Sequence, residues 1–304
     1  MAQHVIVGAG AVGSATALLL AERGDQVRIV TRHGSGPEHQ GIERVSADAT
    51  DATRLTEICT GADALYNCAS PLYHQWFTDW PPLAAAFLTV AERTGAVYAA
   101  MSNLYGYGPV DGPITPQLPI AATHPKLRLR AEMWNDALAA HQAGRVRAVE
   151  VRGSDYIEAN SILSTVIGNA ALAGKRAYAP GPLDVPHSWT SVHDCACTLV
   201  TAAADERAYG QVWFAPTNPP LTLRQLATRF AQVNGAPPAR VTPIPYPVMW
   251  ASGLFSPLIK ELRTTRYQFT RPFVIDASAT TETFGLTPIA LDEALRDAAA
   301  RLRG

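Results

Sequence analysis

Three glycines near the start of the chain have the spacing of a turn that can bind phosphate. Gly8, Gly10 and Gly13 form the pattern G-x-G-x-x-G directly after His4 and the apolar residues 5–7. In a strand–turn–helix unit, the first glycine makes the tight turn and the second lets the backbone approach a pyrophosphate. The third lets the helix pack closely on the strand, and the helix N-terminus then faces the anion. The residues that we expect to hold a dinucleotide in this turn are Gly8, Gly10, Ala11, Val12 and Gly13.

The end of the second expected strand, residues 26–30, indicates which dinucleotide binds. Sites that prefer NAD usually offer an Asp or Glu to the ribose hydroxyls at this point. The sequence has Thr31 and Arg32 here, and a guanidinium can grip a 2′-phosphate with two hydrogen bonds. We therefore expect NADP(H) to be preferred over NAD(H). The alternative is that Arg32 is a solvated loop arginine and that both dinucleotides are used.

The composition is that of an ordinary globular enzyme with a small-molecule substrate. Of the 304 residues, 47% are hydrophobic and 17% are charged, and the formal net charge is -1. A chain with so little net charge is not expected to bind nucleic acid. No apolar run is long enough to span a bilayer, so no membrane partner is expected. We find no signal peptide and expect a cytoplasmic protein.

The four cysteines do not predict a metal site. Cys195 and Cys197 form one close pair, and Cys59 and Cys68 supply no second pair at the spacing of metal ligands. We expect reduced structural thiols and no metal.

Apolar periodicity and turn signals predict strands that alternate with helices through residue 153. Strands are expected at residues 42–45, 64–67, 97–100 and 146–151, and helices at residues 52–60, 81–94 and 127–142. This alternation is typical of an α/β fold, a Rossmann doubly wound parallel sheet with helices on both faces. Residues 1–153 are thus predicted to form the dinucleotide-binding domain.

Beyond Gly153 the alternation weakens, and proline-rich segments separate shorter elements. Helices are expected there at residues 161–173, 195–204, 223–233 and 291–301, the third capped by Thr222. Residues 154–304 are therefore predicted to be mainly a smaller α+β lobe that binds the substrate, with some strands returning to the sheet.

Short motifs along nearly the whole chain occur in the order and at the spacing of one superfamily. They are Asp48-Ala49-Thr50-Asp51, Asn67-Cys68-Ala69-Ser70, Tyr105-Gly106 and the segments 187–194 and 284–288. With the glycine turn, they make the chain resemble the short-chain dehydrogenase/reductases, in the extended branch of nucleotide-sugar epimerases and dehydratases. The resemblance implies that Asp48 and Ala49 meet the adenine. It also implies that Cys68, Ala69 and Ser70 lie beside the nicotinamide ribose.

One pair that this superfamily uses for catalysis is missing from the chain. Members transfer a proton with a Tyr that lies four residues before a Lys, on the same face of a helix. The residues four before Lys126, Lys175 and Lys260 are Ala122, Ala171 and Ser256. Because it lacks the phenol, the chain resembles the atypical group of the superfamily.

Two registers are open for the side chains that replace this pair. Alignment on residues 131–132 puts His124 in the Tyr place and Arg128 in the Lys place, whereas counting from Pro119 puts Lys126 and Arg130 there. Either register leaves a cation and removes the phenol.

His124 is a natural proton donor, because an imidazole titrates near the working pH and needs no lysine helper. Arg128 would keep the ribose-binding part of the missing role, since it donates hydrogen bonds but cannot shuttle protons. Ser102 lies one residue from the usual Ser or Thr position and could aim at the nicotinamide or only cap a turn. His124 could equally be a solvated histidine at a helix start.

Aromatic and imidazole side chains are expected to wall the substrate crevice. They are Tyr73, His74, Tyr105, Tyr156, His187 and Trp189. Few basic side chains lie among the large apolar groups, which favours a small, relatively uncharged, partly aromatic or lipophilic metabolite. The alternative is that most of these aromatic residues belong to the core.

These observations favour an NAD(P)-dependent oxidoreductase, a reductase or dehydrogenase of a small metabolite, with a non-standard proton donor. The missing Tyr and Lys leave two alternatives. One is a non-redox epimerase, dehydratase or cyclase on the same scaffold, and the other is a catalytically silent protein that senses NADP(H). The resemblance also implies a homodimer, formed through the helices expected at residues 81–94 and 127–142.

Overall fold

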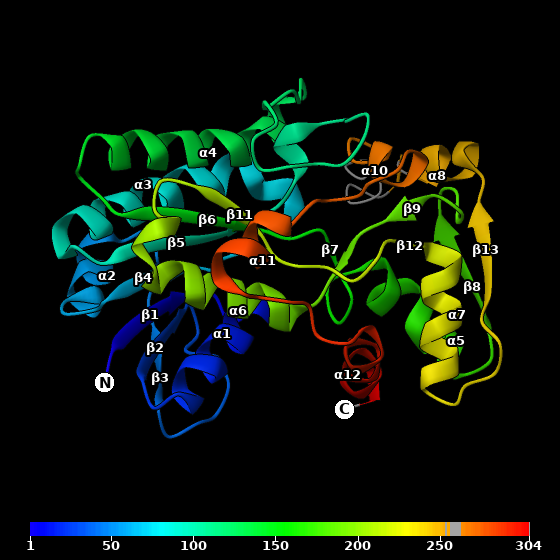
Figure 1. Ribbon diagram of the computed structural model, residues 1–304, viewed down its shortest axis with the longest axis horizontal. Helices are drawn as coiled ribbons and strands as arrows, with labels where there is room; N and C mark the ends of the chain where they lie inside the picture. Colours follow the sequence, from blue (N-terminus) through cyan, green and yellow to red (C-terminus); the bar gives the residue numbers. More distant parts are fainter. Residues whose placement is uncertain (253, 256–262, 304) are drawn as a thin grey trace. The chain divides into compact units, whose positions relative to one another are not determined.

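A parallel sheet of seven strands organises the first of two compact units of the chain. The computed structural model describes residues 1–252, 254–255 and 263–303 (Figure 1). The first unit comprises residues 1–106, 128–152 and 195–214, and the second comprises residues 107–127, 153–194 and 215–304. Ser256 and Lys260, which were compared with the spacing of the missing Tyr and Lys, lie outside the described residues.

The order of the strands in this sheet is that of a doubly wound fold. The strands are β1 (Gln3–Val7), β2 (Gln26–Thr31), β3 (Ile42–Ser46), β4 (Ala64–Asn67), β5 (Val97–Ser102), β6 (Ala148–Arg152) and β11 (Val212–Phe214). They follow the spatial order β11-β6-β5-β4-β1-β2-β3, and every neighbouring pair is parallel. The strand order reverses beside β1, where such sheets bind ligands at the carboxyl ends of the strands. The predicted Rossmann sheet is confirmed, and β11 is the strand that returns to it from beyond residue 153.

Helices cover both faces of this sheet. They are α1 (Ala11–Glu22), α2 (Ala52–Cys59), α3 (Trp76–Thr94), α4 (Pro125–Gln142) and α6 (Val192–Ala204). Figure 1 shows α3 and α4 on one side of the strands and α1 and α6 on the other. Because both faces are covered, every residue of β4 and β5 is buried.

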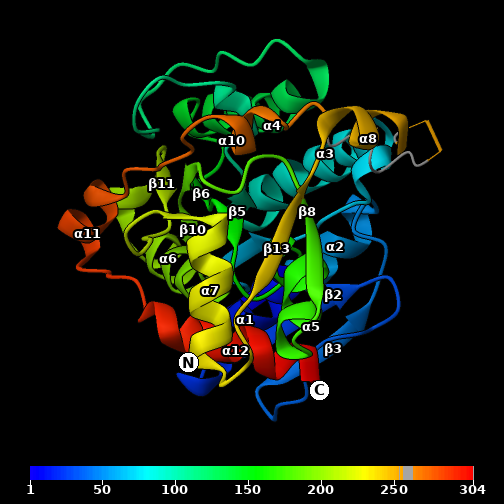
Figure 2. The same cartoon turned by 90° about the vertical axis from the view of Figure 1, so that its right-hand side faces the viewer.

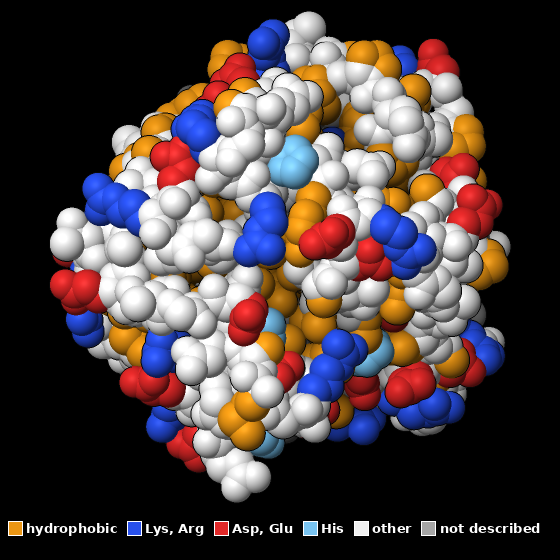
Figure 3. Space-filling view, turned by 60° about the vertical axis from the view of Figure 1, so that its left-hand side comes forward, with side chains coloured by type: hydrophobic (Ala, Val, Ile, Leu, Met, Phe, Trp, Pro, Cys, Tyr) orange, Lys and Arg blue, Asp and Glu red, His pale blue; other side chains and the backbone are white. Residues whose placement is uncertain are grey.

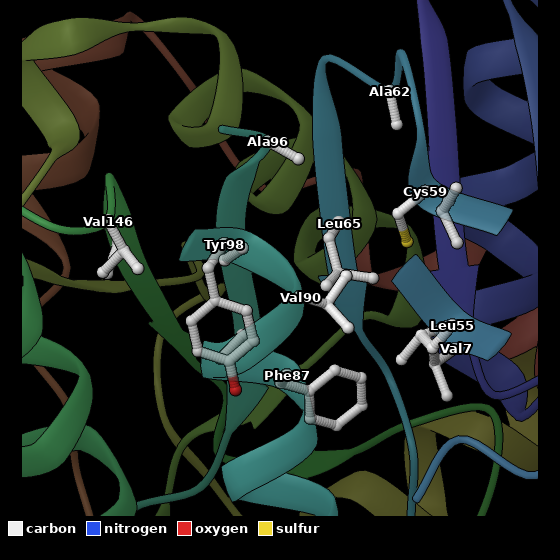
Figure 4. Packing of buried hydrophobic residues seen from close by; sticks show 14 of the residues in the cluster. Val7, Leu55, Cys59, Ala62, Leu65, Phe87, Val90, Ala96, Tyr98 and Val146 are labelled. Carbon is white, nitrogen blue, oxygen red and sulfur yellow. The ribbon is translucent and has the colours of Figure 1, made fainter. Parts of the chain in front are cut away.

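The core on the side of α2, α3 and α4 is closely packed. Leu55, Phe87 and Trp134 from these helices meet Leu65 and Tyr98 from the strands in one cluster. The rings of Phe87 and Tyr98 stack with their centroids 5.8 Å apart (Figure 4). This cluster fixes the helices that carry the candidate site onto the strands that end there.

Helix α3 begins at Trp76, earlier than the predicted start at Pro81. Pro81 and Pro82 lie inside the helix, where each removes one backbone hydrogen bond. The added turn is stabilised by ring packing, since Trp76 and Trp80 contact each other with centroids 6.4 Å apart. Trp76 also stacks on Tyr105, and the guanidinium of Arg130 lies over the ring of Trp80, so contacts distant in sequence outweigh the local preference of proline for a helix start.

The chain after β6 also differs from the prediction. The strand covers Ala148–Arg152 and not residues 146–151, and Tyr156 is not at its end. Tyr156 lies in the two-residue strand β7 (Asp155–Tyr156), which pairs with β10 (Trp189–Thr190). Between β6 and β7, the backbone N–H of Ser154 donates to the hydroxyl of Thr190 at 2.9 Å.

The second unit is built from short strand pairs and helices around its own core. Its further strands are β8 (Arg176–Pro180), β9 (Pro186–His187), β12 (Leu221–Thr222) and β13 (Arg240–Ile244). Its helices include α5 (Gly168–Leu172), α7 (Leu223–Val233), α8 (Tyr246–Ser252), α10 (Tyr267–Thr270), α11 (Ser278–Phe284) and α12 (Leu291–Arg303). Figure 2 shows β8 and β13 side by side, with α5, α7 and α12 packed near them.

Of two helices predicted in this unit, one is confirmed and the other is not. Helix α7 has the predicted bounds, and Thr222 caps it in a reciprocal capping box with Gln225. The helix predicted at residues 161–173 is instead a π-helical turn (Leu163–Ile167) followed by α5. Side-chain hydroxyls compete for the helix backbone there, because Thr165 donates to the carbonyl oxygen of Ser161 at 2.6 Å.

The surface carries charges of both signs. On the face shown in Figure 3, basic and acidic side chains are interspersed and neither sign forms a large patch. No helix in the described part of the chain combines the length and the apolar character needed to cross a membrane.

The core cluster predicts a large difference between two phenylalanines of α3. Phe87 is fully buried, whereas Phe77 is 52% exposed. Phe87→Ala should lower the free energy of unfolding by about 3–5 kcal/mol, because it removes the ring and leaves a cavity. Phe77→Ala is the matched control and should change stability by less than about 0.5 kcal/mol. Denaturant unfolding measures both, and equal losses for the two variants would contradict this packing.

Candidate active site

The glycine turn is shaped by close backbone packing at two positions and by open space at the third. A Cβ atom on Gly8 would lie 2.5 Å from the carbonyl oxygen of Cys68, and Gly8 has a φ of +104°. A Cβ atom on Gly13 would collide with the carbonyl oxygen of Gly8. At Gly10 a Cβ atom would meet nothing within 4 Å, so this backbone is open to an approaching ligand. The turn therefore has the form that a pyrophosphate needs.

The N-terminus of α1 is open next to this turn. Gly10 is the N-cap residue, and within the described residues no side chain caps the helix there. No acidic side chain lies in its first turn, so the positive end of the helix dipole is not neutralised. Ala11 is half-buried, and Val12 and Gly13 are buried against the sheet. Backbone N–H groups beside small side chains suit an anion at this point.

A cavity of about 390 Å³ lies where β1, β2, β3 and β4 end. It is lined by residues 7–8, 30–32, 47–50, 69–71, 78–79 and 82–83. Of the predicted cofactor residues, it brings together Gly8, Thr31, Arg32, Asp48, Ala49, Ala69 and Ser70. Four loops far apart in the sequence thus form one site, as the doubly wound topology predicts.

Arg32 and Asp48 give this cavity charges of opposite sign. The carboxylate of Asp48 accepts hydrogen bonds from the backbone N–H and the hydroxyl of Thr50, at 2.9 and 2.8 Å. These bonds, with a smaller effect of the nearby Arg32 guanidinium, hold the pKa of Asp48 below its usual value. Asp48 is therefore an ionised acceptor at neutral pH, and Arg32 supplies a cation at the end of β2.

One wall of the cavity comes from residues that the sequence analysis missed. Thr78, Asp79, Pro82 and Leu83 lie in the first turns of α3 and line the cavity. Their spacing of three and four residues places them on one helix face. The sequence analysis missed this spacing because it placed the start of the helix at Pro81, so that residues 76–80 were expected to precede the helix.

Cys68 lies beneath the glycine turn and does not line the cavity. Its side chain packs against Gly13, and burial raises the pKa of its thiol to about 12. This packing follows from the close approach of α1 to β4, and the position of Cys68 beside the nicotinamide ribose stays a prediction.

Buried polar groups lie at the carboxyl ends of β5 and β6. Ser102 is the last residue of β5 and is in register with Arg152 of β6. Arg152 is held by Glu150, with its Nε 2.7 Å from a carboxylate oxygen. Arg130 of α4 donates to the carbonyl oxygen of Met101 at 2.6 Å. Two arginines thus lie beside the strand end that carries Ser102.

Helix α4 exposes one of the two predicted catalytic pairs and buries the other. His124 is exposed, and its Nδ1 accepts a hydrogen bond from the backbone N–H of Lys126 at 3.2 Å. Arg128 is exposed and forms an ion pair with Glu132 at 3.3 Å. Lys126 and Arg130 are only 2% and 5% exposed and lie one turn apart on the same helix face. The geometry favours the register of Lys126 and Arg130, with His124 as a helix cap.

Of the residues expected to wall the substrate crevice, three lie in the first unit. Tyr73 and His74 belong to the 3-10 turn η1 (Tyr73–Gln75), where His74 is exposed. The rings of Tyr73 and Tyr105 contact each other with centroids 6.3 Å apart. The structure therefore brings the two tyrosines together.

The other three residues lie in the second unit, and two of them are buried within it. The ring of His187 lies between Trp189, at 4.5 Å, and Phe269, at 5.5 Å. Its Nε2 is 2.9 Å from a carboxylate oxygen of Asp155. His187 and Trp189 therefore agree with the alternative that these aromatic groups belong to the core, whereas Tyr156 is half-buried.

Comparison with known proteins gives one sequence match and many structural matches. Residues 4–146 match the family described as the saccharopine dehydrogenase NADP binding domain. The search of curated protein sequences returns no match.

Three solved structures illustrate the structural likeness. The enzyme WbmH of Bordetella bronchiseptica in complex with NAD+ has a TM-score of 0.75 at 16% identity, covering 100% of this chain and 98% of that one. UDP-glucose 4-epimerase of Thermotoga maritima has a TM-score of 0.78 at 14% identity, with coverages of 99% and 98%. DesIV, a dTDP-glucose 4,6-dehydratase of Streptomyces venezuelae with NAD bound, has a TM-score of 0.76 at 16% identity, with coverages of 99% and 97%.

The chain has the Rossmann fold of these enzymes. The match extends over the whole chain, so the predicted Rossmann fold is confirmed. The matched NADP-binding domain contains the glycine turn and Arg32.

The turn geometry predicts different effects for two glycines of this Rossmann protein. Gly10→Ala should change the free energy of unfolding by less than about 1 kcal/mol, since its Cβ meets open space. The same variant should weaken NADP(H) binding about tenfold or more, because the methyl group hinders hydrogen bonds to the charged pyrophosphate. Gly13→Ala should lower stability through its collision with Gly8. Calorimetric titration with denaturant unfolding separates these effects, and a Gly10→Ala variant with unchanged affinity would contradict the assignment.

Proposed function

We propose that the chain is an NADP(H)-dependent oxidoreductase of a small, relatively uncharged metabolite. The observation that carries this proposal is the cavity that Gly8 of the glycine turn, Arg32 and Asp48 line together. When bound there, the dinucleotide would supply or accept a hydride, and the protein would supply orientation and one proton donor. Gly10 and the start of α1 would hold the pyrophosphate, and Asp48 would accept from the adenine amino group.

The preference for NADP over NAD rests on Arg32. The side chain lines the cavity at the end of β2, where an NAD site usually has a carboxylate. A guanidinium forms charge-assisted hydrogen bonds to a 2′-phosphate, whereas NAD has only a hydroxyl to offer. The match to an NADP binding domain supports this preference, although the structures of WbmH and DesIV contain NAD.

Replacing Arg32 should therefore affect one dinucleotide selectively. Arg32→Ala should weaken NADPH binding about tenfold or more, through the loss of a hydrogen bond to a charged group. NADH binding should stay close to that of the wild type, because NADH has no 2′-phosphate. His33→Ala, at the exposed neighbouring position, is the matched control. Titration calorimetry with both dinucleotides checks this, and an equal loss for NADPH and NADH would overturn the role of Arg32.

Proton transfer is assigned to Lys126, with Arg130 and Ser102 as hydrogen-bond donors. An ammonium can release a proton to a carbonyl oxygen as it gains negative charge, whereas a guanidinium cannot. Arg130 would keep the binding part of the missing lysine's role, and its contact with Met101 fixes it beside β5. The burial of Lys126 and Arg130, against the exposure of His124 and Arg128, supports this choice.

Lys126 and Arg128 provide a test of this assignment on one helix. Lys126→Met should lower kcat about 100-fold or more, since a general acid contributes at least that factor. Lys126→Arg should lower kcat by the same factor, because it keeps the charge but cannot donate the proton. Arg128→Met should retain wild-type turnover. NADPH oxidation against a panel of aldehydes, ketones and imines measures all three, with NADPH affinity as the control for folding. Full activity in Lys126→Arg would contradict proton donation.

A non-redox reaction is the second candidate, because the solved structures include an epimerase and a dehydratase. In such a reaction the dinucleotide is regenerated within each turnover. Product formed without net NADPH consumption would identify this candidate, and net consumption would exclude it.

A further inference from the structure

A short stretch of the second unit exposes large apolar side chains to solvent. It consists of α8 and residues 254–255, and we term it the apolar segment. Its exposed side chains, with exposed fractions from 40% to 89%, are Tyr246, Val248, Trp250, Leu254 and Phe255. These five are almost half of the eleven exposed large apolar side chains in the described part of the chain, so the exposure is concentrated at one place. Figure 2 shows α8 directly after the end of β13.

The exposed side chains lie on different sides of α8. Successive residues of an α-helix are turned by about 100°, so Tyr246 and Trp250 lie on one side and Val248 lies nearly opposite. Pro247, which lies between these sides, is exposed as well. A folded partner with a rigid surface would cover one side of such a helix and leave the other in water. The hydrophobic effect is non-directional and fluid lipid chains can surround all sides, so the arrangement favours a membrane surface over a protein.

The apolar segment carries no charge, and several of its polar groups are bonded within the chain. No Asp, Glu, Lys or Arg occurs in the sequence from residue 241 to residue 259. The backbone N–H groups of Val248 and Met249 both donate to the carbonyl oxygen of Pro245, at 3.0 and 3.2 Å. The hydroxyl of Ser252 donates to the carbonyl oxygen of Val248 at 2.9 Å. Polar groups with internal partners make the transfer of a segment from water into lipid less costly.

Two arginines lie beside the aromatic rings of the apolar segment. The guanidinium of Arg266 lies 4.1 Å from the ring centre of Tyr246, and that of Arg263 lies 5.0 Å from the ring centre of Trp250. Arg263 also donates to the carbonyl oxygen of Trp250, and Arg266 is exposed. Guanidinium groups bind phosphate oxygens, and Tyr and Trp rings favour the headgroup region of a bilayer. The arginines and rings together therefore complement the charge and polarity of an anionic membrane surface.

We propose that the apolar segment inserts into the surface of a membrane that contains anionic phospholipids, with Arg263 and Arg266 on the lipid phosphates. This inference does not rest on the proposed function. A helix that spans a bilayer needs about 20 apolar residues, whereas a segment that lies in the headgroup region needs only enough apolar surface to enter it. The expectation of no membrane partner rests on the absence of a spanning run, and that criterion does not apply to a surface-bound segment.

The test is sedimentation of the full chain with lipid vesicles. Vesicles of phosphatidylcholine and phosphatidylglycerol in equal parts should bind the wild type, and vesicles of phosphatidylcholine alone should bind it about fivefold or more weakly. Phe255→Ser and Leu254→Ser should each weaken binding to the mixed vesicles about tenfold or more, because each removes an apolar side chain that enters the lipid. Tyr178→Ser, at a tyrosine of the same unit that is 58% exposed, is the matched control and should bind like the wild type.

A charge variant and a measurement without lipid complete the test. Arg266→Gln should weaken binding to the mixed vesicles about fivefold and leave binding to phosphatidylcholine unchanged. Equal unfolding temperatures of the variants and the wild type control for folding. Absence of binding to the mixed vesicles, or equal binding of the wild type and Phe255→Ser, would overturn the proposal. Sedimentation velocity without vesicles tests the other occupant, since a wild-type oligomer that Phe255→Ser dissociates would make the segment an interface between copies and would also overturn the proposal.

Discussion

The close approach of α1 to the ends of β1 and β4 is the constraint on which the rest of this structure depends. Gly8 and Gly13 leave no room for a side chain, because the backbone of Cys68 and the carbonyl oxygen of Gly8 occupy that space. This packing aims the N-terminus of α1 at the carboxyl edge of the sheet. It also forces Cys68 into a packing role. The open position at Gly10, the cavity and the charges around it follow from this arrangement.

The same edge of the sheet carries the groups that would act on a substrate. Ser102 ends β5, and Arg130 reaches the neighbouring Met101 from α4. Burial of a lysine and an arginine is unfavourable unless hydrogen bonds and neighbouring groups compensate for lost hydration. Apolar side chains could fill these two buried positions, so packing alone does not require Lys126 and Arg130 there. Their burial on one face of α4 is therefore the observation behind the proposal that this cationic pair acts on the substrate.

The part of the fold that could be predicted is the part governed by local rules. The glycine spacing and the buried strands predicted the sheet, and Thr222 predicted the start of α7, because each effect acts within a few residues. The predicted start of α3 was wrong, since Trp76 packs on Tyr105 and Trp80 on Arg130, both distant in the sequence. The choice between the registers of α4 stayed open for a similar reason. Sequence spacing gives two faces of a helix, and only packing shows which face is buried.

The most direct test of the account is calorimetric titration of the wild-type protein with NADPH and NADH under identical conditions. We expect one site per chain, with NADPH bound about tenfold or more tightly through its 2′-phosphate. Tighter binding of NADH would contradict the role of Arg32. The absence of binding heat for both dinucleotides across a range of temperatures would contradict the assignment of the cavity itself.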